Sequence, residues 1–235
     1  MSVNDISLRY AQGEVFNSEK RFRVLVAGRR FGKSYLSCIE LLRGAINRPG
    51  EVYFYCAPTY RMAKDIAWKE LKRLVPKVWI KAKNETDLRL DLINGSSIEL
   101  KGTENAMALR GRSLAGVVLD EAAFMDRDVW AEVNRPALAD KQGWALFIST
   151  PDGTASWFYD MWCFCGEQEW DDWQRWSFTT LKGVMLQQKK LRQLGHNWMQ
   201  EHLDRNLRQV LRILLVWLLL ALVITILIKK YRIYI

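Results

Sequence analysis

The chain has 235 residues, a length typical of one α/β domain or of one domain with an appendage. Hydrophobic residues make up 49% of it and charged residues 26%, so most of the chain is expected to bury a core. The net charge of +9 belongs mainly to residues 183–235, which hold nine Lys and Arg but only two acids, Glu201 and Asp204. This uneven spread argues against a strongly basic nucleic-acid surface on the rest of the chain.

Short apolar runs alternate with helical patterns over the first 150 residues. Most of these runs are hydrophobic nearly throughout, which is typical of parallel strands covered on both faces. Strands are predicted over residues 23–27, 52–57, 97–100, 116–120 and 145–149. Helices are predicted over residues 33–45, 61–74 and 127–138, the last broken by Pro136. This alternation predicts an α/β fold, with a mostly parallel, doubly wound sheet flanked by helices.

One segment departs from the parallel pattern. Residues 88–100 alternate between apolar and polar side chains and contain the pair Asn94-Gly95. Such a pair between alternating runs is a strong signal for a tight turn. We therefore expect an antiparallel hairpin here before the parallel sheet resumes.

Residues 26–34 read VAGRRFGKS and vary the nucleotide-binding P-loop, whose usual form is Gly, four residues and Gly-Lys-Ser/Thr. Ala27 stands where the first glycine is usual, and Gly28 follows one residue late. Because a predicted strand precedes the loop and a predicted helix follows it, the context favours a phosphate cradle. Lys33 would then reach the β- and γ-phosphates of a nucleotide, and the Ser34 hydroxyl would bind Mg²⁺.

A second acidic motif lies at the end of the predicted strand 116–120. The run GVVLDE places Asp120 and Glu121 where a Walker B pair stands in P-loop enzymes. Asp120 is expected to hold the magnesium ion, directly or through water. Glu121 is expected to orient and deprotonate the attacking water.

Three further features are open to more than one interpretation. Residues 148–153 (ISTPDG) end a predicted strand, and Thr150 could sense the γ-phosphate or merely cap a turn. Residues 56–61 (CAPTYR) could serve the site or only begin a helix. The tryptophans within residues 157–176 are interleaved with acids, so we favour packing over base stacking.

Arginines near the two motifs are candidates for neutralising charge in the transition state. They are Arg29, Arg30, Arg110 and Arg112. For each of them the alternative is a solvated surface side chain.

Together these motifs resemble the ATPase domain of the large terminase subunit of tailed phages, the motor that packages DNA into the capsid. The resemblance covers roughly residues 8–181. It rests on GRRFGKS (28–34), APTY (57–60), the Arg110-Gly111 step, DEA (120–122) and STP (149–151).

The resemblance implies a RecA-like P-loop NTPase fold of the additional-strand type and hydrolysis of ATP with Mg²⁺. It implies nucleotide contacts from the loop Gly28, Arg29, Arg30, Phe31, Gly32, Lys33 and Ser34, and from Gln12 to adenine and Thr150 to the γ-phosphate. Ser34 and Asp120 would hold the metal, and Glu121 would be the catalytic carboxylate. Arg29 or Arg30 would act in cis, and Arg110 in trans from a neighbouring copy.

The same resemblance implies a set of partners and a location. The partners are double-stranded DNA, the capsid portal protein, a small terminase subunit and further copies of the chain in a ring. The location is the cytoplasm of a bacterial host.

The two ends of the chain differ in character. Residues 1–20 are polar and carry no apolar segment of the kind a signal peptide needs. The C-x-C pair Cys163 and Cys165 has only His196 and His202 as possible imidazole ligands, so free thiols are expected rather than a zinc site. Residues 1–182 are expected to form the ATPase domain, and residues 183–235 a basic and apolar helical tail.

An alternative function rests on this tail. Residues 213–228 form an uncharged run flanked by basic residues, slightly short of the roughly 17–25 apolar residues of a spanning helix. The alternative is a membrane-associated P-loop protein anchored by this run, which we do not favour. Carbonate extraction of the full chain and of a chain lacking residues 205–235 would distinguish the two.

The tail also departs from the family that the motifs resemble. Large terminases continue into a nuclease that binds two metals through clustered carboxylates. The two acids of residues 183–235 cannot build such a site. We expect no nuclease activity, and we hypothesise that the tail replaces the original sequence through a lost reading frame in a prophage copy.

Sequencing the locus tests this hypothesis. We expect an alternative frame downstream of codon 182 to encode an acid-rich, nuclease-like segment. If neither alternative frame does so, the hypothesis fails.

Overall fold

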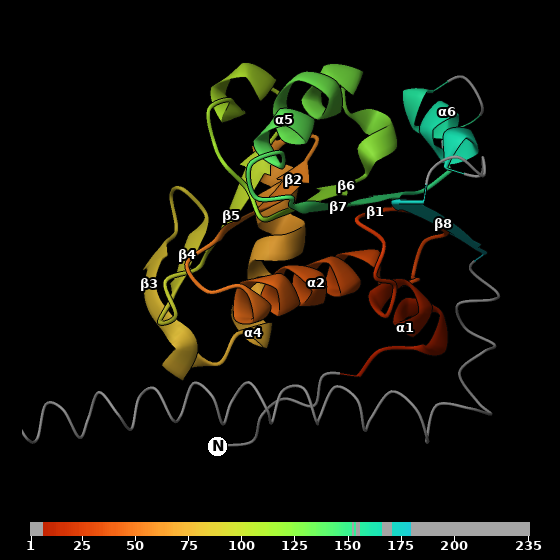
Figure 1. Ribbon diagram of the computed structural model, residues 1–235. Helices are drawn as coiled ribbons and strands as arrows, with labels where there is room; N and C mark the ends of the chain where they lie inside the picture. Colours follow the sequence, from red (N-terminus) through yellow and green to blue (C-terminus); the bar gives the residue numbers. More distant parts are fainter. Residues whose placement is uncertain (1–6, 152, 154–155, 166–170, 180–235) are drawn as a thin grey trace, which may run out of the picture. The chain divides into compact units, whose positions relative to one another are not determined.

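The computed structural model describes residues 7–151, 153, 156–165 and 171–179, and these residues are organised around a single twisted sheet (Figure 1). Its strands are β1 (Phe22–Ala27), β2 (Val52–Ala57), β3 (Ile80–Asn84), β4 (Arg89–Leu92), β5 (Ser97–Gly102), β6 (Gly116–Asp120), β7 (Trp144–Ser149) and β8 (Trp173–Phe178). They are ordered β3-β4-β5-β2-β6-β7-β1-β8. Neighbours from β5 to β8 are parallel, whereas β3, β4 and β5 pair antiparallel.

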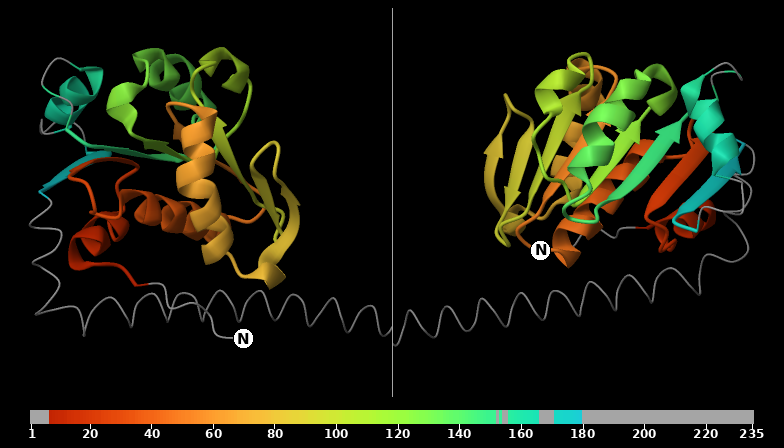
Figure 2. Two further views of the ribbon diagram at one scale, coloured as in Figure 1. Left: turned by 180° about the vertical axis from the view of Figure 1, so that it is seen from behind. Right: turned by 45° about the horizontal axis from the view of Figure 1, so that its top comes forward.

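Helices cover both faces of the sheet. They are α1 (Tyr10–Phe16), α2 (Lys33–Asn47), α3 (Tyr60–Ala63), α4 (Lys69–Leu74), α5 (Arg135–Ala137) and α6 (Trp157–Phe164). Short π- and 3₁₀-helical segments accompany them at Lys64–Trp68, Lys77–Trp79, Ala106–Leu109, Ala122–Phe124 and Val129–Asn134. Helices α1 and α2 lie on one face, and α5 and α6 lie on the other (Figures 1 and 2). The predicted α/β fold with a mostly parallel sheet is confirmed.

The five predicted strands are all present, together with the hairpin. Strand β4 pairs antiparallel with β5, and Gly95 in the connecting turn has a φ of 84°, a conformation that favours glycine. Two strands were not predicted. The side chains of β3 are half-buried at Ile80 and exposed beyond it, so the strand lacks an apolar pattern, and β8 mixes aromatic and polar residues without a regular alternation.

The predicted helices are present with altered details. Helix α2 continues two residues beyond the predicted end, and the segment from α3 to α4 is helical throughout but passes through a π-helical turn. The third helix changes from π-helical to α-helical at Arg135, just before Pro136. Proline has no backbone N–H, so Pro136 donates no helical hydrogen bond that the change of helix type could break.

Trp173 lies in the core, and the half-buried Trp157 and Trp162 pack against it, which agrees with the predicted packing role. The Trp173 ring lies 4.7 Å from Phe22 and 5.9 Å from Phe147, measured between ring centroids. The Trp157 indole N–H donates to the carbonyl of Met125 at 2.7 Å. Trp170 lies outside the described residues.

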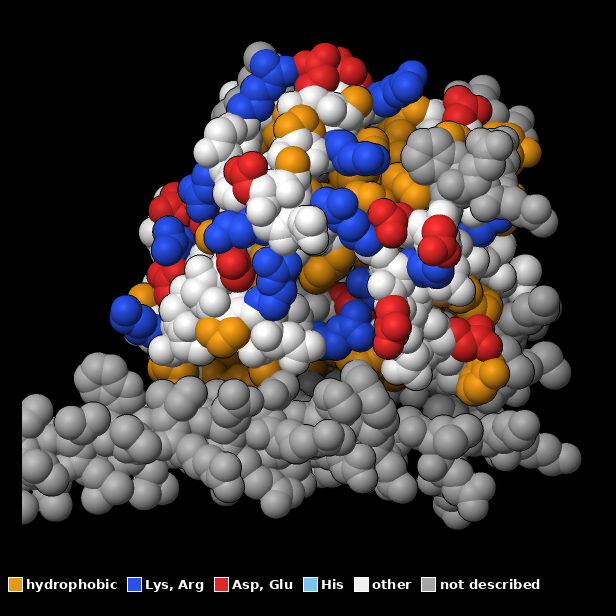
Figure 3. Space-filling view, viewed as in Figure 1, with side chains coloured by type: hydrophobic (Ala, Val, Ile, Leu, Met, Phe, Trp, Pro, Cys, Tyr) orange, Lys and Arg blue, Asp and Glu red, His pale blue; other side chains and the backbone are white. Residues whose placement is uncertain are grey.

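Figure 3 shows basic and acidic side chains intermingled over one face of the described residues. On this face the two kinds of charge are mixed and neither dominates. The predicted tail, including its apolar run, lies outside the described residues. Within the described ranges, no helix has the length and apolar character needed to cross a membrane.

A buried ion pair joins the elements on both sides of the predicted phosphate loop. Arg23 on β1 donates two hydrogen bonds to Glu40 on α2, at 2.7 and 3.1 Å, and a third to the carbonyl of Val15 in α1. Arg43 donates a further bond to Glu40 at 2.6 Å. Arg23 is 2% exposed and Glu40 is fully buried. Because water does not reach these groups, each charge is stabilised by its charged and hydrogen-bonding partners in the protein.

We predict that Arg23→Ala destabilises the domain by about 3–5 kcal/mol, because it leaves Glu40 buried with only one charged partner. The matched control is Arg61→Ala, since the Arg61–Asp65 pair is 92% and 63% exposed. An exposed pair of this kind contributes about 0–1 kcal/mol. Chemical denaturation measures both free energies of unfolding, and equal losses in the two variants would contradict the prediction.

Candidate nucleotide site

The loop between β1 and α2 adopts a conformation that requires glycine at one position. Gly32 has a φ of 88°, and a Cβ added there would lie 2.5 Å from the amide nitrogen of Gln12. Arg30 also lies in the left-handed region, with a φ of 65°. These two positions turn the chain sharply into the N-terminus of α2, where free N–H groups favour an anion.

Gln12 braces this loop from α1. Its amide nitrogen donates to the carbonyls of Phe31 and Gly32 at 3.0 and 3.2 Å, and its amide oxygen accepts from the Arg9 N–H at 2.8 Å. The side chain is 3% exposed. Gln12 therefore supports the loop, and its predicted contact with adenine stays a prediction.

The opposite side of the loop is held by β8. The Gly28 N–H donates to the Phe178 carbonyl at 3.1 Å, and the Phe31 and Phe178 rings stack with centroids 5.3 Å apart. Phe31 is 2% exposed. Its side chain therefore packs in the core, so the contribution that we predicted from Phe31 would have to come from its backbone.

Lys33 lies inside the loop and faces the predicted catalytic acid. Its ammonium group donates to the Ala27 carbonyl at 2.9 Å and lies 3.7 Å from a carboxylate oxygen of Glu121. The side chain is 9% exposed. The lysine charge therefore lies between the phosphate loop and the predicted catalytic acid.

Asp120 is the last residue of β6, and its side chain contacts residues of α2 and β2. One of its oxygens, Oδ2, accepts from Ser34 Oγ at 3.2 Å and from the hydroxyl of Tyr55 in a short hydrogen bond, while Oδ1 accepts from the Glu121 N–H at 3.1 Å. Burial raises the pKa of the Asp120 carboxyl, and the hydrogen bonds from Tyr55 and Ser34 act in the opposite direction. Burial and the adjacent Asp120 raise the pKa of Tyr55 well above its usual value, so its hydroxyl keeps its proton.

The donor set around Asp120 fits magnesium. Mg²⁺ prefers oxygen ligands and is commonly held by one or two carboxylates together with substrate phosphates. The Ser34 hydroxyl lies 3.2 Å from Oδ2 of the Asp120 carboxylate, so the two side chains are close enough to bind one ion. These two residues would hold the ion.

Glu121 is fixed by the end of β7. Its Oε2 accepts from Thr150 Oγ1 at 3.0 Å, from the Thr150 N–H at 3.2 Å and from Ser149 Oγ at 3.3 Å. The residue has a φ of 55°, an unusual backbone conformation for a glutamate. The strand end thus holds Glu121 through three donors, an arrangement that the motif alone did not indicate.

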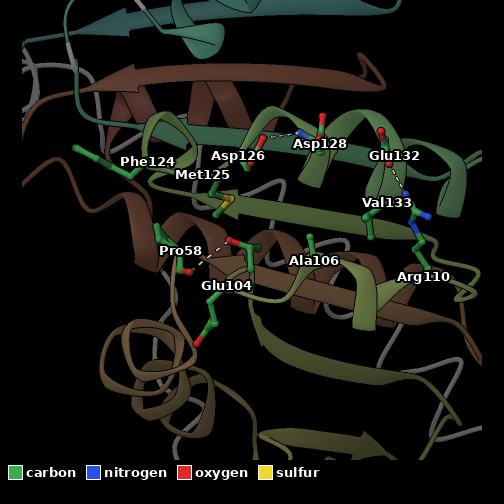
Figure 4. A pocket seen from close by; sticks show the side chains of 11 residues that line it. Pro58, Glu104, Ala106, Arg110, Phe124, Met125, Asp126, Asp128, Glu132 and Val133 are labelled. Carbon is green, nitrogen blue, oxygen red and sulfur yellow. Dashed lines mark hydrogen bonds and ion pairs between the residues drawn. The ribbon is translucent and has the colours of Figure 1, made fainter.

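The predicted arginines occupy different places. Arg29 and Arg30 are exposed on the loop. Arg110 lies apart from the loop, in a hollow of about 410 Å³. Figure 4 shows it pointing toward Glu132, with which it forms an ion pair, at the opposite end of the hollow from Phe124. Arg112 pairs with the buried Glu99 at 2.6 Å, which is a structural role.

Comparison with known proteins shows the family of this chain. The model of the family "Terminase large subunit, T4likevirus-type, N-terminal" matches residues 24–216. The chain belongs to the terminase large subunit family. The predicted resemblance is thereby confirmed.

Curated relatives agree with this assignment. The terminase large subunit of Thermus virus P23-45 is 31% identical over 170 residues, which is 64% of this chain and 35% of the relative. That of Escherichia phage T5 is 31% identical over 161 residues, covering 65% and 35%. The match therefore spans about a third of each relative's length.

Solved structures share the fold. The large terminase ATPase domain of Thermus phage P74-26 superposes with a TM-score of 0.66 at 27% identity, covering 73% of this chain and 81% of that chain. The large terminase of a thermophilic bacteriophage in complex with ADP gives a TM-score of 0.64 at 17% identity, covering 75% and 46%. At the latter identity the similarity concerns the fold alone. The RecA-like fold that we predicted is confirmed.

We predict that Gln12→Ala weakens the binding of ADP and GDP alike, by about tenfold, because it removes two hydrogen bonds that shape the loop. Fluorescence titration with labelled ADP and GDP measures both dissociation constants. Glu14→Ala, at an exposed position of the same helix, is the control and should leave both unchanged. A loss confined to ADP would instead support the predicted contact with adenine.

Proposed function

We propose that this terminase domain binds ATP with Mg²⁺ between the loop 28–34 and the pair Asp120–Glu121, and hydrolyses it to drive the packaging of double-stranded DNA. The observation that carries the proposal is the convergence of Lys33, Ser34 and the two acids at one edge of the sheet. The ADP and ATP-γ-S complexes of the thermophilic bacteriophage terminase support nucleotide binding in this fold.

The residues divide the chemistry between them. Lys33 exchanges the Ala27 carbonyl for phosphate oxygens, which neutralises charge that develops in the transition state. The magnesium ion, when bound, supplies electrostatic stabilisation of the β- and γ-phosphates. Ser34 and Asp120 hold that ion, and the loop N–H groups orient the phosphates.

Glu121 is the general base of the proposed reaction. Its Oε2 is occupied by Ser149 and Thr150, and its Oε1 lies 3.7 Å from the Lys33 ammonium. A nucleotide that draws Lys33 away leaves Oε1 available to accept a proton from water. Thr150 thereby helps to position the general base Glu121, in addition to any direct contact of Thr150 with the γ-phosphate.

The arginines complete the proposed site. Arg29 or Arg30, both exposed on the loop, would act in cis on the nucleotide. Arg110 would act in trans, after exchanging Glu132 for the nucleotide site of a neighbouring copy. The proposed partners are further copies of the chain in a ring, the portal protein and a small terminase subunit, and the proposed location is the cytoplasm of a bacterial host.

The described residues contain no observation that favours the alternative of a membrane-anchored P-loop protein. It rests on residues 213–228, which lie outside the described residues. The packaging motor is therefore the function that we propose.

We predict that Lys33→Ala abolishes ATP binding, whereas Glu121→Gln retains binding and lowers the turnover rate by about 100-fold or more, because it removes the base but keeps the shape. Equilibrium binding and phosphate release measure the two effects. Glu85→Gln, an exposed acid paired with Lys72 and Lys83, is the control. Unchanged turnover in Glu121→Gln would rule out the assigned base.

A further inference from the structure

Tyr55 lies in the interior of the sheet beside the predicted metal ligands. It stands on β2 and is fully buried. In the parallel register it is paired with Val118 on β6, two residues before Asp120. Because side chains two residues apart share a face of a strand, Tyr55 and Asp120 lie on the same face of the sheet. Its hydroxyl thus reaches Asp120 across adjacent strands.

The hydrogen bonds that Asp120 accepts are distributed unequally between its two carboxylate oxygens. A carboxylate offers about four lone-pair positions, two on each oxygen. On Oδ2 both are taken, by the hydroxyls of Tyr55 and Ser34, whereas Oδ1 accepts only from the Glu121 N–H. Oδ1 therefore keeps capacity for a metal ion or a metal-bound water.

The carboxylate depends on Tyr55 for this orientation. Asp120 is 2% exposed, so water does not replace a missing donor easily. Ser34 is the other side-chain donor, and it is also an expected metal ligand. Tyr55 is thus the side-chain donor to Asp120 that has no other expected task at the site.

We propose that Tyr55 is a positioning residue of the magnesium site, whose hydroxyl fixes the Asp120 carboxylate and leaves Oδ1 available to a metal ion or a metal-bound water. The proposal rests on the proposed function, because it concerns the same nucleotide site. The hydroxyl takes no part in the reaction itself and acts through Asp120.

The same strand offers a matched control. Tyr53 is also fully buried and, paired with Gly116, lies on the same face of the sheet. Its hydroxyl donates to the Gly44 carbonyl of α2 at 2.7 Å, away from Asp120. Tyr53→Phe and Tyr55→Phe therefore each remove one buried hydroxyl and one hydrogen bond from the same strand.

The experiment measures the affinity of the full chain for a fluorescent ADP analogue, once with excess Mg²⁺ and once with EDTA. The ratio of the two dissociation constants reports how strongly metal and nucleotide support each other. We expect Tyr55→Phe to lower this ratio by about tenfold, as loss of an outer-shell partner of a metal ligand does, and to leave affinity in EDTA unchanged. Tyr53→Phe should keep the wild-type ratio.

The outcomes separate the two proposals. A wild-type ratio in Tyr55→Phe would overturn the role of Tyr55 and leave the proposed function standing. An equal fall in both variants would show a general effect of a lost buried hydroxyl and would also overturn it. Absence of magnesium-dependent binding in the wild-type chain would overturn the proposed function together with this inference.

Discussion

The contact between Ser34 and Asp120 is the interaction on which the rest of the site depends. It joins the first turn of α2 to the end of β6, at 3.2 Å. Together with the contact between Lys33 and Glu121, it links the phosphate loop to the acidic end of the strand. The side chains of Lys33, Ser34, Asp120 and Glu121 therefore lie close together, where the charged groups interact electrostatically.

The surrounding structure holds this contact in place from several sides. Gln12 and Phe178 brace the loop, and the buried pair Arg23–Glu40 ties β1 to α2 beneath it. On the acidic side, Ser149 and Thr150 fix Glu121. A site held by buried donors loses little freedom when a nucleotide binds, which is how preorganised groups favour catalysis.

Sequence alone could predict those site residues that belong to a short local motif. Lys33, Ser34 and Asp120 follow from spacing along the chain and from the strands and helix that flank them. Thr150 was expected near the γ-phosphate. Its hold on Glu121 was not, since it depends on the register that pairs Asp120 with Ile148 across two strands. Spacing within one segment carries no information about such a register.

Other features lay beyond prediction for similar physical reasons. The run VYFYCA shows that Tyr53 and Tyr55 share a face of β2, but not which face. The exposed strand β3 lacks an apolar pattern, and the partner of Arg110 comes from a segment 22 residues away. The packing of Phe31 against Phe178 joins parts of the chain that no local pattern connects.

The most direct test is a crystal structure of the chain with Mn²⁺ in place of Mg²⁺ and a slowly hydrolysed ATP analogue. Anomalous scattering locates the manganese independently of the phosphates. The account predicts the metal in contact with Ser34 Oγ and facing Asp120, with Lys33 on the phosphates and Thr150 still bonded to Glu121. A metal bound away from Ser34 and Asp120, or a nucleotide outside the loop 28–34, would contradict it.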